Sequence, residues 1–436
     1  MMNYNQAIEY IYGLNKYGIK LGLKNIGLLL SLFDNPHLKT KVIHIAGTNG
    51  KGSTAAMLFS ILKAAGYKVG LYTSPHLVHF QERMRVNEKE ISQYEVCSLL
   101  ERIKPAIEKV ATTEGYQHPT FFEVITAMAF IYFSEKKVDF SIMEAGLGGR
   151  LDATNICQSL ISIISHIDYD HMDRLGNTLS EIAYEKAEII KEKTYVINAE
   201  QHQEAHEKIE SIAKKRHSPL YSVGKEIKHH LIFSDLEGNN FDYTGIYNQY
   251  KDLHIPLAGK YQVENAAMAV AATELINKMT FKVNKDAVFT GLYKSKWPGR
   301  FEIVSREPMI ILDGAHNPNG VARFGENLKK YVPDKRIIAI LGIFSDKDYQ
   351  NILKNIVPFA NLVILTMANN PRATPTHILA RETGNYINSE NIIETTTVDS
   401  AIQEALRIAE KDDLICITGS LYAVGEAEAY FLKNKK

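Results

Sequence analysis

Short apolar segments rich in valine and isoleucine alternate with segments of helical pattern from residue 42 onward. In the first half of the chain these segments are VIHIA, KVGLY, VDFSIMEA, LISIIS and TYVIN, which begin at residues 42, 68, 138, 160 and 194. β-Branched residues favour strands, and a nearly continuous apolar run indicates a strand that is buried on both faces. Alternation of such strands with helices predicts βαβ units and a mainly parallel sheet with helices on both faces.

The pattern changes between residues 221 and 256, where alternating apolar residues flank an EGNN sequence. This predicts antiparallel strands at the edge of the parallel sheet. The alanine-rich helix NAAMAVAATELI follows, and then KSKWPGR at residues 294–300, whose proline and glycine interrupt regular structure. A second alternating series begins after it, with MIIL, IIAIL, LVIL and LICIT as its apolar segments.

We therefore predict an α/β protein with two domains. Residues 1–296 form a mainly parallel, doubly wound sheet with an N-terminal helical segment and an edge antiparallel sheet, and residues 297–436 form a smaller Rossmann-like α/β domain. A length of 436 residues agrees with more than one core.

Charge and hydropathy exclude several classes of protein. The chain has 50 basic and 50 acidic residues, so no net charge favours a nucleic-acid or anionic-membrane surface. The longest nearly apolar run, residues 124–133, is far shorter than a membrane span, and the N-terminus lacks the layout of a secretory signal. We expect a cytoplasmic monomer with small-molecule partners. Cys97, Cys157 and Cys416 have no CxxC spacing and are predicted to be core residues.

A glycine-rich turn with one lysine, AGTNGKGST, joins the first apolar strand to a helix. Backbone N–H groups of such a turn, the positive end of the helix and the Lys51 ammonium together attract phosphate. The spacing differs from G-x-x-x-x-G-K-[ST], but the flanking strand and helix favour a phosphate site over a glycine turn with a solvated lysine. EAGLGGRLD is no dinucleotide fingerprint, because its third glycine would fall at Leu151.

Acidic residues and histidines follow two other strands. Glu144 ends an apolar strand, where a carboxylate can reach a metal ion on nucleotide phosphates, although such a residue is more often a helix cap or a surface group. SHIDYDHMD is either a divalent-metal site or a polar loop, and its residue types alone suggest manganese or zinc. Its candidate ligands are His166, Asp168, Asp170, His171 and Asp173.

HIAGTNGKGST closely resembles the loop of the folylpolyglutamate synthase and dihydrofolate synthase family, which is part of the Mur-type ATP-dependent amide ligases. TSPHLVHFQERMRVN, EAGLGGRLDATN, DHMDRLGNT, EKAEIIK, WPGRFE and LDGAHNP follow in the family's order. The resemblance implies an acid–amino-acid ligase that joins L-glutamate to dihydropteroate or to the glutamate tail of reduced folates through an acyl phosphate.

Three other functions are considered beside the bifunctional ligase. A monofunctional folylpolyglutamate synthase fits the same motifs. A Mur-type ligase for a UDP-sugar peptide would have a uridine-binding domain before the loop, and only residues 1–41 precede the first strand here. A P-loop ATPase or kinase would turn over ATP without forming an amide bond.

The resemblance also implies roles for individual residues. ATP binding is assigned to Thr48, Asn49, Gly50, Lys51, Gly52, Ser53, Asn265, Arg300 and Asp313. Two Mg²⁺ ions are assigned to Ser74, Glu144, His171 and Lys186, with Lys186 carbamylated. Lys51, Lys186, Asp313 and His316 are the catalytic candidates, and His316, Ser345 and Ser420 are candidates for glutamate binding. Dihydropteroate is assigned to Leu21, Gly22, Leu23, Lys24, Thr120, Phe121, Phe122, Glu123, Leu151, Asp152 and Ala153.

Simpler structural roles are open for several of these residues. Lys186 fits a solvated position on an amphipathic helix, and Glu188 stands where the family usually has glycine. Gln262, Asn265 and His316 lie near predicted helix starts and fit capping roles. Arg300 fits an interdomain salt bridge, and Phe121 and Phe122 fit core positions.

Overall fold

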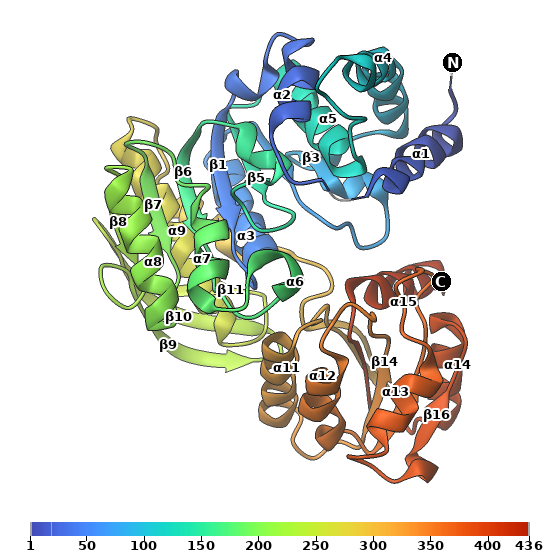
Figure 1. Cartoon of the computed structure of the whole chain (residues 1–436). Coiled ribbons are helices and arrows are strands. Elements are labelled where there is room, and N and C mark those ends of the chain that lie inside the picture. The colour runs from blue at the N-terminus through green and yellow to red at the C-terminus, as the bar shows by residue number, and fades with distance from the viewer. Residues whose placement is uncertain (1, 19, 435–436) are drawn as a thin grey trace.

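The computed structural model describes residues 2–18 and 20–434, which form three sheets and the helices around them (Figure 1). The largest sheet has eight strands in the order β4-β3-β2-β5-β1-β6-β7-β8. In this order, the strands β2, β5, β1, β6, β7 and β8 are all parallel. Strands β3 and β4 extend the sheet beyond β2 in antiparallel pairing. Its strands are β1 Lys41–Ala46, β2 Val69–Tyr72, β3 Met84–Val86, β4 Lys89–Glu90, β5 Phe140–Glu144, β6 Ser159–Ile164, β7 Tyr195–Asn198 and β8 Leu220–Ser222.

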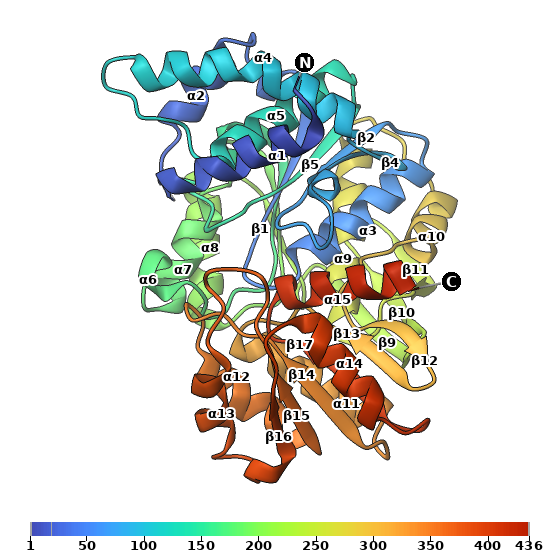
Figure 2. The ribbon, with the colours of Figure 1, turned by 90° about the vertical axis from the view of Figure 1, so that its right-hand side faces the viewer.

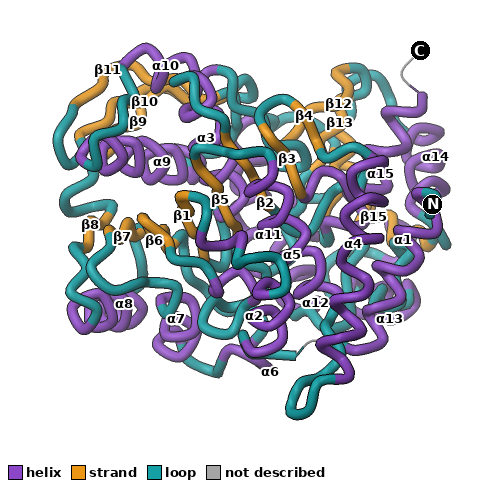
Figure 3. Tube along the Cα trace, turned by 90° about the horizontal axis from the view of Figure 1, so that it is seen from above, coloured by secondary structure: helices purple, strands orange, loops and turns teal. Residues whose placement is uncertain are grey.

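Helices cover both faces of this sheet, as predicted. Seen from above, α3 and α9 lie on one side of the strands, and α7 and α8 lie on the other (Figure 3). Thr120 and Thr178 cap helices through boxes with Glu123 and Glu181. The helices up to the second sheet domain are α1 Tyr4–Gly13, α2 Lys24–Ser31, α3 Lys51–Ala64, α4 Gln93–Thr112, α5 Phe121–Glu135, α6 Met172–Leu175, α7 Leu179–Ala187, α8 Gln203–Lys215, α9 Tyr261–Lys278 and α10 Lys285–Tyr293.

The predicted antiparallel strands are present, but they form a sheet of their own instead of extending the edge of the parallel sheet. Its order is β11-β10-β9, and its strands are β9 Lys228–Asp235, β10 Gly238–Thr244 and β11 Gln249–Ile255. Helix α9 is buried along nearly its whole length, and its alanines share one core with Ile43 of the large sheet and Phe241 of the small one. A helix that is apolar all round must be covered on every side, so α9 lies between the two sheets.

The third sheet belongs to the second alternating series of the sequence. It has the order β12-β13-β17-β14-β15-β16, and every pair is parallel except β12 with β13. We call the part of the chain that contains this sheet the second sheet domain. Figure 2 shows it below the large sheet, with α15 at the boundary. Its elements are β12 Glu302–Arg306, β13 Met309–Leu312, α11 Pro318–Tyr331, β14 Ile337–Leu341, α12 Tyr349–Ile356, β15 Leu362–Leu365, α13 Thr376–Thr383, β16 Ile392–Glu394, α14 Val398–Ile408, β17 Leu414–Thr418 and α15 Leu421–Asn434.

Two predictions about residue classes can be compared with this fold. Cys97, Cys157 and Cys416 are buried and free, so their assignment to the core is confirmed. Among the described residues, none of the helices combines the length and the apolar character that crossing a membrane requires.

Candidate active site

The turn between β1 and α3 has the form of a phosphate loop. Gly50 has a φ of 91°, and a Cβ there would lie 2.3 Å from the Asn265 side-chain oxygen, so only glycine fits. A Cβ at Gly52 would lie 2.7 Å from the Trp297 ring. The first N–H groups of α3, from Lys51 to Ser53, have no partner within the helix and are available to an anion.

Two lysines donate hydrogen bonds to the carbonyl oxygens of this loop. The Lys51 ammonium donates to the carbonyls of Gly47 and Thr48 at 3.0 and 3.2 Å, and Lys186 of α7 donates to the Gly47 carbonyl at 2.9 Å. Lys186 is buried, so it is not the solvated lysine of an amphipathic helix. Burial, followed by the nearby charge of Lys51, lowers the pKa of Lys186 to about 7. Burial also lowers the pKa of Lys51.

Glu144 lies at the end of β5 beside the loop. It is buried, and its carboxylate accepts the N–H of Ser74 at 3.1 Å, so it is neither a surface residue nor a helix cap. Burial raises the pKa of Glu144, and the positive charge of Lys51 opposes that shift. A buried carboxylate at this position can ligate a divalent metal ion that is bound to phosphate.

The acidic and histidine residues after β6 divide into separate groups. Asp170 and His171 face Lys347 from the loop after β14, whose ammonium lies 2.6 Å from the Asp170 Oδ1 and 3.2 Å from the His171 Nε2. Asp173 is instead exposed and ion-paired with Arg174. His166, Asp170 and His171 line one cavity, whereas Asp168 and Asp173 do not, so the five candidates do not form a single ligand set.

The charges around Asp170 fix its protonation state and that of its neighbour. Burial alone would raise the pKa of Asp170, but the Lys347 ammonium holds it well below its usual range. Burial lowers the pKa of His171 to about 4, so the imidazole is neutral at pH 7, and its Nε2 accepts the Lys347 ammonium through the lone pair that a metal ion would use. Because Lys347 belongs to the second sheet domain and Asp170 to the first, their ion pair joins the two domains.

Arg300 and Asp313 approach the loop from the second sheet domain. The Asp313 carboxylate accepts the N–H groups of Phe301 and Ala315, each at 2.8 Å, and so fixes the segment that carries Arg300. Within the described residues, no carboxylate lies within ion-pair distance of the Arg300 guanidinium. Arg300 is therefore not an interdomain salt bridge here, and its charge is available to an anion.

Three residues that the sequence placed near helix starts have other roles. Helix α11 is capped by Asn317, whose side chain accepts the Gly320 N–H, and His316 instead lies 2.8 Å from the Gly314 carbonyl. Burial, followed by the charge of Lys347, lowers the pKa of His316 to about 4. Asn265 donates to the Gln262 side chain at 3.0 Å, and both are buried inside α9 instead of capping it.

These groups enclose one cavity of about 200 Å³ between the large sheet and the second sheet domain. Because strands β1, β5 and β6 all end here, side chains from distant parts of the sequence converge on it. The predicted residues that line it are Thr48, Asn49, Gly50, Lys51, Gly52, Ser53, Ser74, Glu144, His166, Asp170, His171, Lys186, Asn265, Arg300, Asp313 and His316.

The three segments assigned to dihydropteroate do not line this cavity but lie behind its wall. The Gly22 N–H donates to the Leu151 carbonyl at 3.3 Å, and the Lys24 ammonium donates to the Gly115 carbonyl at 2.7 Å. Phe122 packs against the backbone of Gly146, which does line the cavity. Ring stacking and capping hold the remaining residues, through the contacts of Phe121 with Tyr12, of Thr120 with Glu123, and of Asp152 with the N–H groups of Gly146, Leu147 and Thr154.

Ser345 and Ser420 also lie outside the cavity lining. Ser345 is exposed after β14, and its N–H donates to the Arg372 carbonyl at 2.8 Å. Ser420 is buried after β17, and its hydroxyl accepts the Ala423 N–H at 3.1 Å.

The sequence prediction missed Lys347, Tyr261 and Arg323. Tyr261 and Arg323 line the cavity beside Asn265, and Lys347 contacts the metal-ligand candidates Asp170 and His171. The signal for Lys347 was present, because the polar sequence FSDKD follows an apolar strand, and carboxyl ends of parallel strands carry ligands.

A parallel sheet with a phosphate loop, facing a second α/β domain across a charged cavity, defines the Mur ligase class. Two family models match accordingly: the Mur ligase middle domain over residues 45–273 and the Mur ligase, glutamate ligase domain over residues 299–421. Dihydrofolate synthase/folylpolyglutamate synthase of Bacillus subtilis is 37% identical over 97% of this chain and 98% of its own length. The chain belongs to the dihydrofolate synthase/folylpolyglutamate synthase family of Mur-type ligases.

Solved structures agree with this membership. The crystal structure of folylpolyglutamate synthase from Thermotoga maritima matches with a TM-score of 0.86 and 36% identity, covering 99% of this chain and 97% of that one. The structure of E. coli FolC in complex with DHPP and ADP matches with a TM-score of 0.88 and 29% identity, covering all of both chains.

Proposed function

We propose that this protein uses ATP to join L-glutamate to dihydropteroate and to the glutamate tail of reduced folates. One observation carries the proposal: basic side chains from both sheet domains converge on one phosphate loop, beside buried carboxylates. These are Lys51, Lys186, Lys347 and Arg300. The Bacillus subtilis relative is named for both synthase activities, and the E. coli relative was solved with DHPP and ADP, which supports this substrate class.

The reaction needs an activated carboxylate, since a free carboxylate has no leaving group that an amine can displace. A substrate carboxylate oxygen bonds to the γ-phosphorus of ATP, the bond to the β–γ bridging oxygen breaks, and ADP leaves. The neutral amine of glutamate then attacks the acyl carbon, the bond from that carbon to the phosphate oxygen breaks, and the amine loses a proton. No nucleophilic side chain is required.

The residues of the cavity supply positioning and charge neutralisation for this transfer. The first N–H groups of α3 and the Lys51 ammonium bind the terminal phosphates, and Arg300 approaches them from the second domain. Enclosure between the two domains keeps water from the acyl phosphate until the amine arrives. Asn265 and Gln262, together with Tyr261 and Arg323, form the end of the cavity that remains for the nucleoside.

We also propose two magnesium sites, with Ser74 and Glu144 at the first and Glu144, His171 and Lys186 at the second. The residues fit, because Glu144 is a buried carboxylate and the Lys347 ammonium already occupies a cation position between Asp170 and His171. Bound magnesium supplies neutralisation of phosphate charge. Ser74 and Glu144 offer hard oxygens, as magnesium prefers.

Carbamylation of Lys186 would give the second site an anionic oxygen ligand. A lysine reacts with carbon dioxide only as the neutral amine, and Lys186 has a pKa of about 7. Lys51 and Lys347 both lower that pKa, so they would also stabilise the negative carbamate. Glu188, the departure from the usual glycine, does not interfere, because it pairs with Arg216 at 2.9 Å.

We expect Lys186→Ala to lower ligase activity by about 100-fold, since loss of a ligand should cost at least as much as loss of an outer-shell partner. Small carboxylic acids such as formate should restore part of the rate by replacing the carbamate. Wild-type activity should fall as the pH drops through about 7, because the amine becomes protonated. Lys214→Ala, at an exposed position of α8, should have no effect. Failure of every acid to restore activity would argue against the carbamate.

The test of the function is mass analysis of products after incubation with ATP and glutamate, using dihydropteroate and tetrahydrofolate as separate acceptors. We expect ADP release to require both glutamate and an acceptor, and each acceptor to gain glutamate. Extension of tetrahydrofolate alone would indicate a monofunctional folylpolyglutamate synthase. ATP turnover that is indifferent to glutamate would instead support an ATPase or kinase.

Two organisational proposals accompany this function. We propose that the chain divides between residues 296 and 297, which is supported by the end of α10 at Tyr293 and the start of the third sheet at Glu302. We also propose that the enzyme acts as a monomer in the cytoplasm, because the cavity is formed by the elements of a single chain.

A further inference from the structure

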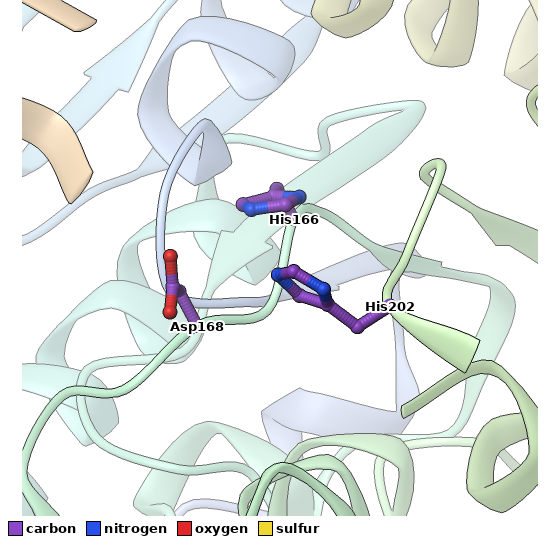
Figure 4. Close-up of side chains that lie close together, drawn as sticks. All are labelled: His166, Asp168 and His202. Carbon is purple, nitrogen blue, oxygen red and sulfur yellow. The ribbon is translucent and has the colours of Figure 1, made fainter. Parts of the chain in front are cut away.

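Two histidines and an aspartate lie close together beside the phosphate loop. One of them, His166, also lines the cavity that holds the proposed magnesium ligands, and the other two do not. His166 and Asp168 follow β6, and His202 immediately precedes α8. Each offers a ligand atom, and the three atoms lie within 4.8 Å of one another. Figure 4 shows the two imidazole rings side by side, with the Asp168 carboxylate next to them.

The tautomer of His166 leaves its Nε2 with a lone pair that can bind a metal ion. Its Nδ1 lies 3.3 Å from the Glu200 carbonyl oxygen, which can only accept, so Nδ1 carries the proton. Its Nε2 is buried and has no hydrogen-bond partner among the described residues. Metal-binding histidines commonly donate their other N–H to a carbonyl in this manner.

Hydrogen bonds hold the two segments of the cluster together. Gln201 accepts the Ile167 N–H at 2.8 Å and donates to the Ser165 carbonyl at 3.0 Å, so it joins the residue before His202 to the residues on both sides of His166. The Asp168 carboxylate accepts the Tyr169 N–H through Oδ1, and no hydrogen bond within the described residues occupies Oδ2. The site is therefore organised without a ligand.

We propose that His166, Asp168 and His202 form a binding site for a late first-row divalent metal ion, zinc above all, separate from the magnesium sites. Two imidazoles and one carboxylate form a three-ligand set that suits zinc and leaves a fourth position open. Magnesium does not favour such a nitrogen-rich set and keeps to oxygen ligands. The open position would take water.

The position of this site links its occupancy to the phosphate loop. The His166 carbonyl accepts the N–H groups of Thr48 and Asn49 at 2.9 and 3.1 Å. The Thr48 hydroxyl donates to the Asp168 carbonyl at 3.0 Å. A metal ion on the side chains of His166 and Asp168 would restrain these carbonyls and therefore make the loop more rigid.

The experiment is titration of the full-length protein with Co²⁺ alone and then Zn²⁺, with millimolar Mg²⁺ present to fill the oxygen-rich sites. We expect visible cobalt bands that zinc abolishes, and zinc should raise the Tm. In His202→Ala the affinity for zinc should fall by at least about 100-fold, and zinc should not raise the Tm. His202 is exposed, so its removal leaves the core intact.

The matched control is His377→Ala, which removes an exposed histidine from α13 of the other domain and should bind as the wild type does. Asp168→Asn provides a second variant of nearly equal shape and should also weaken binding. Equal cobalt spectra and zinc affinity in wild type and His202→Ala would overturn the proposal, as would absence of binding by the wild type. The readout is metal binding itself, so it does not depend on ligase activity.

Discussion

Lys51→Ala is expected to lower kcat for glutamate-dependent ADP release by about 1,000-fold, the upper end of the effect of removing one transition-state donor. Lys51 places a full positive charge on the phosphate loop, and its ammonium now lies on neutral carbonyl oxygens of Gly47 and Thr48. When the Lys51 ammonium moves from these carbonyls to a transferring phosphoryl group, it gains charge–charge attraction. An alanine side chain offers no such attraction.

The same substitution should leave the fold intact. Burial disfavours the charged form of Lys51, the carboxylates of Glu144 and Asp170 favour it, and the charges of Arg300 and Lys347 disfavour it. Its removal relieves the cost of burying this charge, so the Tm of Lys51→Ala should be close to that of the wild type. The matched control is Lys63→Ala on the same helix, where the ammonium pairs with Glu88 at the surface. Nearly normal kcat in Lys51→Ala would mean that the triphosphate binds elsewhere.

The phosphate loop could be predicted from sequence because all of its parts are contiguous. Strand, glycines, lysine and helix lie within residues 42–57, and local backbone preferences decide their geometry. The fold class was equally accessible, since alternation of buried strands and helices is a local pattern that permits few architectures.

Contacts across long sequence separations could not be predicted in this way. Lys347 meets Asp170 over 177 positions, and nothing local to FSDKD specifies which strand end it will face. His166 and Asp168 lie close to His202, and Asp170 and His171 contact Lys347, which a list of metal-binding residue types does not reveal.

The burial of Lys186 has a signal in the sequence. It lies four residues after Ile182 and three before Ile189, so helical periodicity places it on their buried face. The alternative of a solvated lysine rests on the rule that charges face solvent, and this rule fails at functional sites, where a buried charge is retained for chemistry.

Arg300→Ala is expected to lower kcat by about 1,000-fold, because an arginine that reaches a transferring phosphoryl group from another domain has effects of that order. Asp313 fixes the neighbouring backbone through the Phe301 N–H, and Arg300 has no ion-pair partner among the described residues. Its guanidinium is thus positioned but unneutralised. Arg300→Lys should recover part of the rate, since it keeps the charge and loses the bidentate geometry.

The control for this variant is Arg306→Ala on β12, which removes an exposed arginine that pairs with Glu237 and should leave kcat unchanged. The double variant Lys51→Ala/Arg300→Ala gives a sharper measurement. If both cations act on the same phosphoryl group, the fold-loss of activity in the double variant should be smaller than the product of the two single fold-losses. Independent, multiplicative losses would indicate that Arg300 acts away from the phosphates. Non-additivity would therefore require the two domains to close on one triphosphate.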